Sequence, residues 1–244
     1  MTIKIQYISD IHLEFRSKLP KIKPNADILV LAGDIGDPYT KIYKWLLNDV
    51  SIKFKKIFII PGNHEYYNDQ FDIDQINNYI SNLLLEFPNI TFLYDSYEDY
   101  NGYRFIGSVL WSKITNPCYL TNDFKYIKNI SIFLFNELHN ISKEFIKEAI
   151  KSSELPIIMI THFIPSLNFI INDKYAQCFA SNCDELFNSK IKLWIYGHTH
   201  HNNYIENYKN VKFVCNPLGY PYEKALSNYN LIVDIDNINL MDSN

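Results

Sequence analysis

Residues 191–202 read IKLWIYGHTHHN, a mainly apolar run that leads directly into a glycine and three histidines. The run IKLWIY is typical of a buried strand, because it is short, continuous and rich in β-branched and aromatic side chains. Histidine is scarce, with only seven in 244 residues, so a cluster of three behind Gly197 is unusual. On an extended segment His198 and His200 point the same way, whereas His201 should point to the opposite side.

The same arrangement, a buried strand followed by polar side chains, recurs four more times along the chain. The apolar runs at 3–8, 27–32, 56–60 and 156–160 are followed by DIH (10–12), GDIGD (33–37), GNHE (62–65) and TH (161–162). In α/β sheets, ligand sites gather at the carboxyl ends of the strands. We therefore expect these side chains to converge, although they span almost the whole sequence.

Helical patterns at 39–50, 72–87 and 131–151 lie between the strands and indicate a layered α/β fold. The segment 90–111 resembles a strand pair with a turn at Asn101-Gly102, and 203–235 contains further short strands. These strands predict mixed rather than purely parallel sheets. We expect a single domain over residues 1–244, with the irregular stretch 112–130 forming a loop or small cap over the site.

The net charge of −4 argues against a partner such as long nucleic acid, which favours a basic excess, but it permits a small nucleotide. The sequence begins without the continuous apolar stretch of a signal peptide, and no apolar run is long enough to span a membrane. A cytoplasmic protein is expected. The oligomeric state cannot be inferred from the sequence.

The four cysteines, Cys118, Cys178, Cys183 and Cys215, form no CxxC pair. We expect reduced thiols, as in an intracellular protein. A cysteine zinc site is a poor alternative, because Cys178 and Cys183 lack a second matching pair. His139 lies in a predicted helix and is expected at the surface.

Each polar motif has an ordinary structural explanation when taken alone. GDIGD can be a turn in which Asp34 accepts backbone hydrogen bonds, and Asn63 can cap a helix. His162 can be a buried histidine that merely satisfies its own hydrogen bonds. The five strand ends together favour a metal centre, because otherwise independent strands would all carry metal-ligand side chains by chance.

The donor types indicate which metals fit. Carboxylate, amide and imidazole donors suit Mn, Fe or Zn better than calcium, which prefers oxygen ligands alone. The candidate ligands are too many for one tetrahedral ion and sufficient for two ions that share a bridging ligand. Two ions about 3.5–4 Å apart are a standard arrangement for displacement at phosphorus. Two divalent metal ions are therefore the expected cofactors.

The motifs DIH, GDIGD, GNHE, TH and GHTH, in this order from Asp10 to His200, resemble the calcineurin-like metallophosphoesterase superfamily. Its signature is D-x-H, GD-x-x-D, GNH[ED], H and GH-x-H. The segment CNPLGYPYE (215–223) is further similar to a compact bacterial-type branch. The resemblance implies a four-layer αββα sandwich with mixed sheets, and a phosphatase or phosphodiesterase acting on a small phosphorylated molecule or nucleotide.

The resemblance also implies roles for individual residues. One ion would be held by Asp10, His12 and His200, the other by Asn63, His162 and His198, and Asp34 would bridge both ions. A metal-bridging hydroxide would attack phosphorus in line.

The substrate-facing roles are implied in the same way. His64 would stabilise the phosphoryl oxygens or protonate the leaving oxygen, with Asp37 orienting it and Glu65 as outer support. Asn63, His64 and Tyr220 would contact substrate, and Tyr220 and Tyr222 could stack on a base.

Two residues depart from the pattern of the related branch. Phe163 stands where a second histidine often follows the TH motif, and Leu218 stands where arginine is often found. Both changes would remove polar groups near the presumed substrate mouth.

Two rival functions stay open. The chain could be a catalytically weak or inactive scaffold of the same fold that binds other proteins, but such a scaffold is expected to lose ligands or His64. It could instead hydrolyse another bond as a metallopeptidase, but no HExxH motif is present. The sequence therefore favours a metal-dependent phosphoesterase, with monoester and diester substrates both possible.

Overall fold

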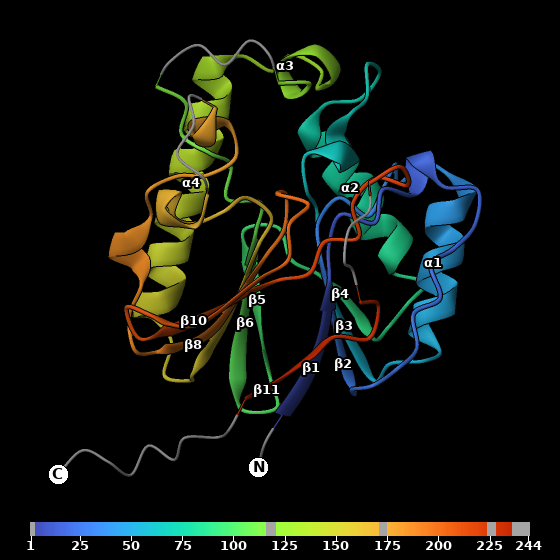
Figure 1. Cartoon of the computed structure of the whole chain (residues 1–244). Coiled ribbons are helices and arrows are strands. Elements are labelled where there is room, and N and C mark those ends of the chain that lie inside the picture. The colour runs from blue at the N-terminus through green and yellow to red at the C-terminus, as the bar shows by residue number, and fades with distance from the viewer. Residues whose placement is uncertain (1–2, 116–120, 171–174, 224–227, 236–244) are drawn as a thin grey trace, which may run out of the picture.

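The computed structural model describes residues 3–115, 121–170, 175–223 and 228–235. Two mixed β-sheets pack face to face, and helices cover their outer faces (Figure 1). The predicted four-layer αββα sandwich is confirmed. The paired residues Ile3 and Ile235 lie at one end of the molecule, and α3 (Asp123–Tyr126) lies at the opposite end (Figure 1).

The first sheet has the strand order β11-β1-β2-β3-β4. Its parallel strands are β1 (Ile3–Ile8), β2 (Ile28–Ala32), β3 (Lys56–Ile60) and β4 (Ile90–Phe92). The edge strand β11 (Ile232–Ile235) pairs antiparallel with β1. The register places Ile5 of β1 opposite Ile28 of β2, so the two strands end at the same sheet edge.

The second sheet has the order β5-β6-β7-β8-β10-β9. Its inner strands β6 (Tyr103–Ser108), β7 (Ile157–Thr161), β8 (Ile191–Tyr196) and β10 (Val211–Cys215) are parallel. The edge strands β5 (Ser96–Tyr100) and β9 (Asn203–Tyr208) are antiparallel to their neighbours.

The expected hairpin turns at Asn101-Gly102, but its first strand is β5 and not the ITFLY run. That run provides β4, which extends the first sheet beside β3. The segment 90–111 therefore crosses from one sheet to the other. The apolar pattern alone could not show this, because β4 and β6 both have apolar side chains.

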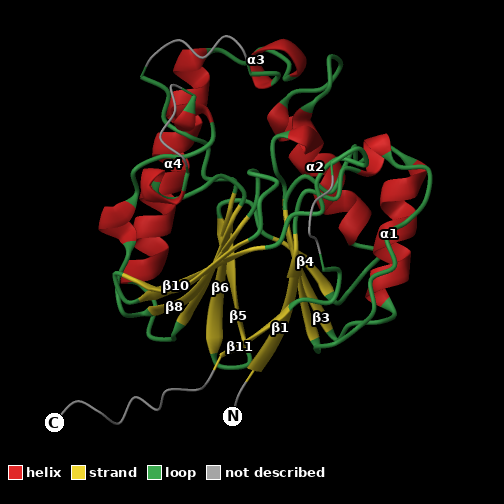
Figure 2. Cartoon of the chain, viewed as in Figure 1, coloured by secondary structure: helices red, strands yellow, loops and turns green. Residues whose placement is uncertain are grey.

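Four α-helices are present in the described residues (Figure 2). Helices α1 (Lys41–Ser51) and α2 (Ile73–Leu84) cover the first sheet, and α4 (Ile132–Lys151) covers the second. The short α3 (Asp123–Tyr126) lies near the strand ends. The one-turn helices are η1 (Leu13–Phe15), η2 (His64–Tyr66), η3 (Leu167–Phe169), η4 (Ala176–Cys178) and η5 (Asp184–Leu186).

The long helices begin where side chains cap their free backbone N–H groups. Thr40 accepts from Tyr43 at the start of α1, and Ser131 accepts from Leu134 at the start of α4. Asp72 and Gln75 form a capping box at the start of α2. The expected helices are thus confirmed to within a few residues.

The apolar side chains form three layers because each inner strand buries both of its faces. In β2, Leu29 and Leu31 pack toward the helices, while Val30 and Ala32 pack toward the second sheet. A third layer lies between the second sheet and α4. Since each fully buried Leu or Ile contributes about 1.5–3 kcal/mol, these layers hold the strand ends in fixed positions.

Two predictions outside the site are wrong. His139 is buried, not exposed, because it lies on the inner face of α4, where its Nδ1–H donates to the carbonyl of Trp111. Cys178 is disulfide-bonded and therefore not a reduced thiol. Cys183 and Cys215 are free and buried, and Cys118 lies outside the described residues. Among the described residues, no helix is both long and apolar enough to cross a membrane.

Candidate metal centre

The five polar motifs meet at one edge of the sandwich, where the carboxyl ends of β1, β2, β3, β7 and β8 lie together (Figure 1). The first sheet provides three of these strand ends and the second sheet provides two. We call their candidate metal-binding residues the ligand cluster: Asp10, His12, Asp34, Asn63, His162, His198 and His200.

The backbone of the ligand cluster is unusual, because five of its members have positive φ angles. These are Asp10 (52°), His12 (50°), Asp34 (54°), His198 (75°) and His200 (53°). Asp, Asn and His adopt this left-handed conformation more readily than most residues, but it still costs free energy. The chain thus turns sharply at each strand end, and the turn directs the side chain inward.

Two glycines allow segments of the chain to approach the cluster closely. A Cβ atom on Gly62 would lie 2.2 Å from Asp34 Oδ1, and one on Gly197 would lie 2.9 Å from Asp10 Oδ2. Any side chain at either position would therefore displace a carboxylate of the ligand cluster. Gly197 has no positive φ, so its backbone conformation does not call for a glycine. The glycine is needed there because the chain packs so closely against Asp10.

Asp10, His12 and His200 form the first group that could hold a metal ion. The Nε2 atoms of His12 and His200 are 2.9 Å apart, and His200 Nε2 lies 3.6 Å from Asp10 Oδ1. The Asp10 carboxylate also accepts the backbone N–H of His198 and the hydroxyl of Ser9, which fixes its orientation.

Asp34, His162 and His198 form a second such group, and Asn63 lies beside it. His162 Nε2 is 3.3 Å from Asp34 Oδ2 and 3.1 Å from the amide oxygen of Asn63. Asp34 Oδ2 also lies 3.8 Å from His12 Nε2 of the first group. The Asp34 carboxylate therefore stands between the two groups.

The imidazole orientations fit metal ligands. His12, His162 and His200 each direct Nδ1 to an oxygen acceptor, respectively Glu14, Ala32 and Glu223, and direct Nε2 to the centre. This pattern of outer hydrogen bonds is typical of histidines that bind a metal through Nε2. Both ring nitrogens of His162 also have partners within the protein, since its Nε2 lies 3.1 Å from the amide oxygen of Asn63.

Two further observations fit a cation in the cluster. His198 Nε2 is buried and has no hydrogen-bond partner among the described residues. His12 Nε2 and His200 Nε2, only 2.9 Å apart, both carry lone pairs when their Nδ1 atoms donate to carboxylates. A divalent ion in each group would satisfy these nitrogens, and the imidazole, amide and carboxylate donors suit Mn, Fe or Zn.

The pKa values show how strongly the cluster attracts positive charge. Burial opposes a charge on His162, yet the adjacent Asp34 carboxylate outweighs it and raises the pKa of His162 to about 10. Burial likewise opposes the charge on Asp34, but His162 and His64 hold the pKa of this carboxyl well below its usual range. Burial, together with the charge of His162, lowers the pKa of His198 well below its usual value.

Glu65 organises the backbone beneath the cluster. Its carboxylate accepts N–H groups from Gly62, Asp34, Ile35 and Gly36, and thereby joins the GDIGD and GNHE turns. Asn63 makes no side-chain cap bond to η2, so its alternative role as a helix cap is excluded. Its amide oxygen instead faces His162 of the ligand cluster.

His64 lies beside the cluster, with its Nδ1 2.8 Å from Glu14 Oε1 and its Nε2 4.0 Å from Asp34 Oδ2. The prediction that Asp37 orients His64 is wrong, because Asp37 accepts from the backbone N–H of Tyr39 at the entry to α1. Burial opposes a charge on His64, but Asp34 and Glu14 outweigh it and raise its pKa to about 9.

Glu14 is a site residue that the sequence analysis missed. Its Oε1 atom contacts Nδ1 of both His12 and His64, so one carboxylate orients a candidate ligand and the candidate acid. Glu14 is two residues after the DIH motif on η1. Its proximity to that motif was the available signal, but the resemblance drew attention to Asp37.

Tyr220 and Glu223 close the other side of the centre. The Tyr220 hydroxyl is 3.2 Å from His64 Nε2, and its ring packs against the rings of His12 and His200. Glu223 accepts from Tyr220 N while contacting His200 Nδ1, so the NPLGYPYE segment is tied to the cluster. Tyr222 stacks on Tyr220 and is largely exposed.

Asn63 has a fixed orientation because its Nδ2 atom has two partners. Asp123 Oδ1 lies 2.8 Å from Nδ2, and Tyr67 Oη lies 3.0 Å from it.

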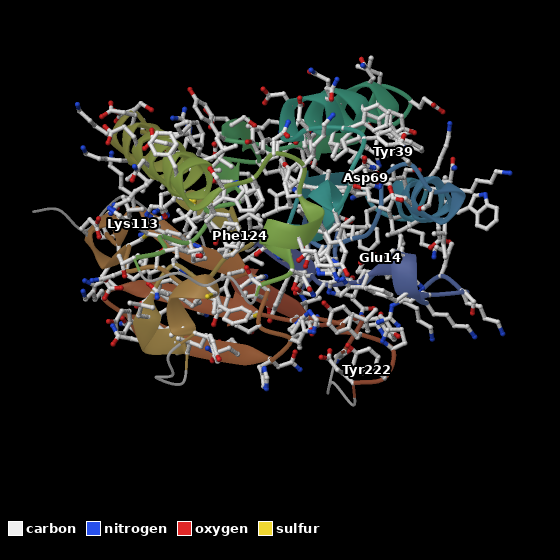
Figure 3. The ribbon with its side chains drawn as sticks, turned by 90° about the horizontal axis from the view of Figure 1, so that it is seen from above. Glu14, Tyr39, Asp69, Lys113, Phe124 and Tyr222 are labelled. Atoms are coloured by element: carbon white, nitrogen blue, oxygen red, sulfur yellow. The ribbon has the colours of Figure 1, made fainter. Side chains whose placement is uncertain are left out.

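We call the residues around the cluster the rim: Glu14, His64, Tyr67, Asp123, Tyr220 and Glu223. Figure 3 looks down on this end of the molecule, with Glu14 on η1 and Phe124 on α3 near its middle.

A cavity of about 620 Å³ opens above the cluster. Its walls combine ligand-cluster and rim residues with Tyr175 and Phe179, and its described lining contains no lysine or arginine. His201 also lines the cavity, but its side chain is exposed and its Nδ1 contacts the carbonyl of Thr199. It is therefore not grouped with His198 and His200.

The two departures from the related branch lie below the cavity and not at its mouth. Phe163 is fully buried, with its ring 4.2 Å from the ring of His198, and Leu218 is 5% exposed within the first apolar layer. Both side chains thus support the site from behind. The expectation that they border the substrate is wrong.

A family model described as calcineurin-like phosphoesterase matches residues 3–202. The chain therefore belongs to the calcineurin-like phosphoesterase family, as predicted. Members of this family depend on a dinuclear metal centre, and the Asp and His groups described above are able to bind metal.

The sequence relatives come from a virus and a bacterium. The uncharacterized protein L509 of Acanthamoeba polyphaga mimivirus is 32% identical over 96% of this chain and 97% of its own length. A probable cyclic nucleotide phosphodiesterase of Coxiella burnetii is 26% identical over 88% of this chain and 82% of its own. Family membership makes a phosphoester hydrolase activity the coarse expectation for this chain.

Solved structures share the fold at low identity. The phosphopantetheinyl hydrolase of Mycobacterium tuberculosis superposes with a TM-score of 0.73 at 17% identity, covering 95% of each chain. A dimetal phosphatase of Danio rerio superposes with a TM-score of 0.50 at 11% identity, covering 89% of this chain and 88% of its own. At such identities the likeness extends to the fold alone.

Proposed function

We propose that this chain is a metal-dependent phosphodiesterase that hydrolyses a small phosphate diester, with a nucleotide as the preferred substrate class. The observation that carries the proposal is the ligand cluster, in which two groups of imidazole and carboxylate donors lie side by side, with Asp34 in the second group and 3.8 Å from His12 of the first. A neutral amide oxygen from Asn63 completes the second group without adding negative charge. The centre is thus suited to attract an anionic ester.

The cavity favours a diester over a monoester. A phosphate monoester carries nearly two negative charges and is usually clamped by arginine or lysine. The described cavity lining contains neither, whereas Asp123 and Glu223 carry carboxyl groups. A diester, with a single negative charge, is repelled less by such walls. The Coxiella relative, a probable cyclic nucleotide phosphodiesterase, supports a nucleotide diester.

The two ions would be held as the resemblance implies. Asp10, His12 and His200 would bind one ion, and Asn63, His162 and His198 the other, with Asp34 between them. When bound, the ions supply positive charge that polarises the phosphoryl group and lowers the pKa of an attacking water. The donors suit Mn, Fe or Zn.

His64 would act on the leaving group. With its Nδ1 bound to Glu14, its Nε2 nitrogen faces the centre, and the Asp34 and Glu14 carboxylates favour the protonated ring by raising its pKa to about 9. The imidazolium would then donate its Nε2 proton to the departing oxygen. Glu14 would keep the ring in the required orientation, and the Tyr220 hydroxyl would limit its rotation.

The aromatic residues at the cavity would bind the organic part of the substrate. Tyr220 and Tyr222 stack with ring centroids 5.3 Å apart and an interplanar angle of 19°. Tyr222 is 79% exposed, so one face of this pair is open to solvent. A nucleobase could stack there, because every base has an aromatic face.

A substrate panel tests the proposed function. The purified chain, reconstituted with Mn²⁺, is assayed with p-nitrophenyl phosphate, bis-p-nitrophenyl phosphate and cyclic nucleotides. We expect faster hydrolysis of the diesters than of the monoester, and loss of activity in Asn63→Ala and His64→Ala. Full activity of Asn63→Ala on the best substrate, or of His64→Ala on a cyclic nucleotide, would refute the assignment. A faster monoester reaction would refute the diester preference alone.

The same panel addresses the alternative of an inactive scaffold. A scaffold would hydrolyse none of these esters even when it binds two ions. The intact pair of His64 and Glu14 argues against this alternative, because a chain without catalysis has no need for an oriented acid beside its metal ligands.

A further inference from the structure

We propose that Asp123 is a positioning residue that orients the amide of Asn63 and thereby couples the position of α3 to the binding of one metal ion. This inference rests on the proposed function only in taking Asn63 as a metal ligand. Asp123 belongs to α3, whereas Asn63 follows β3, so the contact joins two segments 60 residues apart in sequence.

The contact is buried and specific. Asp123 and Asn63 are each 3% exposed, and Asp123 Oδ1 lies 2.8 Å from Asn63 Nδ2. Tyr67 donates its hydroxyl to the same Oδ1 atom at 2.9 Å. Tyr67 Oη in turn lies 3.0 Å from Asn63 Nδ2. The three side chains therefore form a closed triangle in which the amide nitrogen has two protein acceptors.

The triangle decides which end of the amide faces the ligand cluster. An ionised carboxylate only accepts hydrogen bonds, so the NH2 group of Asn63 must point to Asp123. The amide oxygen is then directed to His162 Nε2, at 3.1 Å. With the amide reversed, the NH2 group would face the ion and could not coordinate it. Asp123 thus selects the coordinating orientation.

The choice of residue supports this role over simple packing. A buried carboxylate costs free energy that a leucine of similar size would not. At position 123 the carboxylate adjoins a centre that already contains Asp10 and Asp34, so it also adds like charge. Orientation of Asn63 is a benefit that only an acceptor at this position provides.

The coupling must work in both directions, because linkage between two binding equilibria is reciprocal. If seating of α3 strengthens ion binding, then ion binding must also stabilise the seated position of α3. Helix α3 contributes Asn122 and Asp123 to the cavity wall. Loading of the metal would therefore help to complete the wall that meets the substrate.

Metal titration of the full chain tests the proposal without any turnover. Mn²⁺ binding to the metal-free protein is measured by calorimetry, together with the number of ions bound, for Asp123→Leu, Asp123→Asn and Tyr67→Phe. Outer hydrogen-bond partners of ligands typically contribute about 10–100-fold in metal affinity. We expect Asp123→Leu to weaken one of two binding events by about this factor and to leave the other unchanged.

Matched variants separate orientation from helix stability. Asn122→Leu alters the exposed residue that precedes α3, whose side chain makes no cap bond, and this variant should bind both ions like the wild type. Asp123→Asn retains an acceptor oxygen and should lose less affinity than Asp123→Leu. If Asp123→Leu does not fold, Asp123→Asn and Tyr67→Phe provide the test, each with an expected loss of about threefold or more at one ion.

Hydrogen exchange provides the reciprocal measurement. Mn²⁺ should slow exchange at residues 121–127 in the wild type and in Asn122→Leu, but not in Asp123→Leu. Unchanged affinity for both ions in the folded variants would overturn the proposal. A wild-type exchange rate at residues 121–127 that is the same with and without Mn²⁺ would also overturn it. A wild type that binds two ions but cleaves no ester would refute the proposed function and leave this coupling intact.

Discussion

The ligand cluster and the rim differ in how their residues are held in place. Members of the cluster follow buried strands of two packed sheets, whose hydrogen bonds fix each strand end. Rim residues such as Glu14, Asp123 and Glu223 lie on short helices or loops and are fixed by contacts with the cluster itself. The sheets thus provide the metal site, and the rim adjusts its ligands and meets the substrate.

The largest effect should come from breaking the cluster. His198→Ala removes a buried Nε2 that has no hydrogen-bond partner in the described part of the chain, so we expect loss of one ion and a fall in activity of about 10³-fold or more. Bound metal and hydrolysis of bis-p-nitrophenyl phosphate are the measurements. His201→Ala, which alters an exposed neighbour, should retain both ions; a His198→Ala protein with two ions would contradict the ligand set.

Substitution of His64, a rim residue that is not a candidate ligand, should slow ester hydrolysis and leave metal binding unchanged. If His64 donates a proton, His64→Ala should lose about 10²–10³-fold on an ester with a poor leaving group such as phenolate. It should lose far less on the p-nitrophenyl ester, whose leaving group needs no proton. Metal content should equal that of the wild type. Equal losses on both esters would show that His64 only stabilises charge.

The smallest predicted effect is a dependence of Mn²⁺ affinity on pH, which should distinguish a residue of the ligand cluster from a residue of the rim. The proton on His162, whose pKa is about 10, must leave before Nε2 can bind an ion. Since the group is protonated below this pKa, Mn²⁺ affinity should rise about tenfold per pH unit between pH 7 and pH 9. Calorimetry at several pH values measures this slope.

Two variants sharpen the pH experiment. His162→Gln cannot carry the displaced proton, so its affinity should depend less steeply on pH than that of the wild type. His64→Gln removes a rim proton that no ion displaces, and its slope should match the wild type. A wild-type affinity that is constant from pH 7 to pH 9 would disagree with the raised pKa of His162.

The sequence predicted the fold because its buried strands are short apolar runs separated by clear helical patterns. The layers, the mixed sheets and the turn at Asn101-Gly102 are confirmed. The pairing of β4 with β3 was missed, since an apolar run carries no information about which sheet it joins. His139 was missed for a related reason, because one polar residue on a helix does not reveal its side.

The candidate site also contains residues that the sequence predicted and residues that it missed. The residues of the ligand cluster stand directly after strands, so the topology alone brings them together, and their metal-binding roles stay predictions. Of the rim, His64 and Tyr220 were named through the family resemblance, whereas Glu14 and Asp123 were missed, because they reach the site through local backbone geometry and not as part of a family motif. Asp37, which has the right spacing, turns to the start of α1 instead.

The left-handed backbone at five of the candidate ligands has a consequence for the history of such chains. At Asp10, Asp34 or His200, a glycine would relieve the positive φ and an asparagine would tolerate it, whereas valine or isoleucine would increase the strain. A copy of this chain released from selection for activity would therefore gain stability as it lost its ligands. Decay of the enzyme would be recognisable as glycine or asparagine at these strand ends.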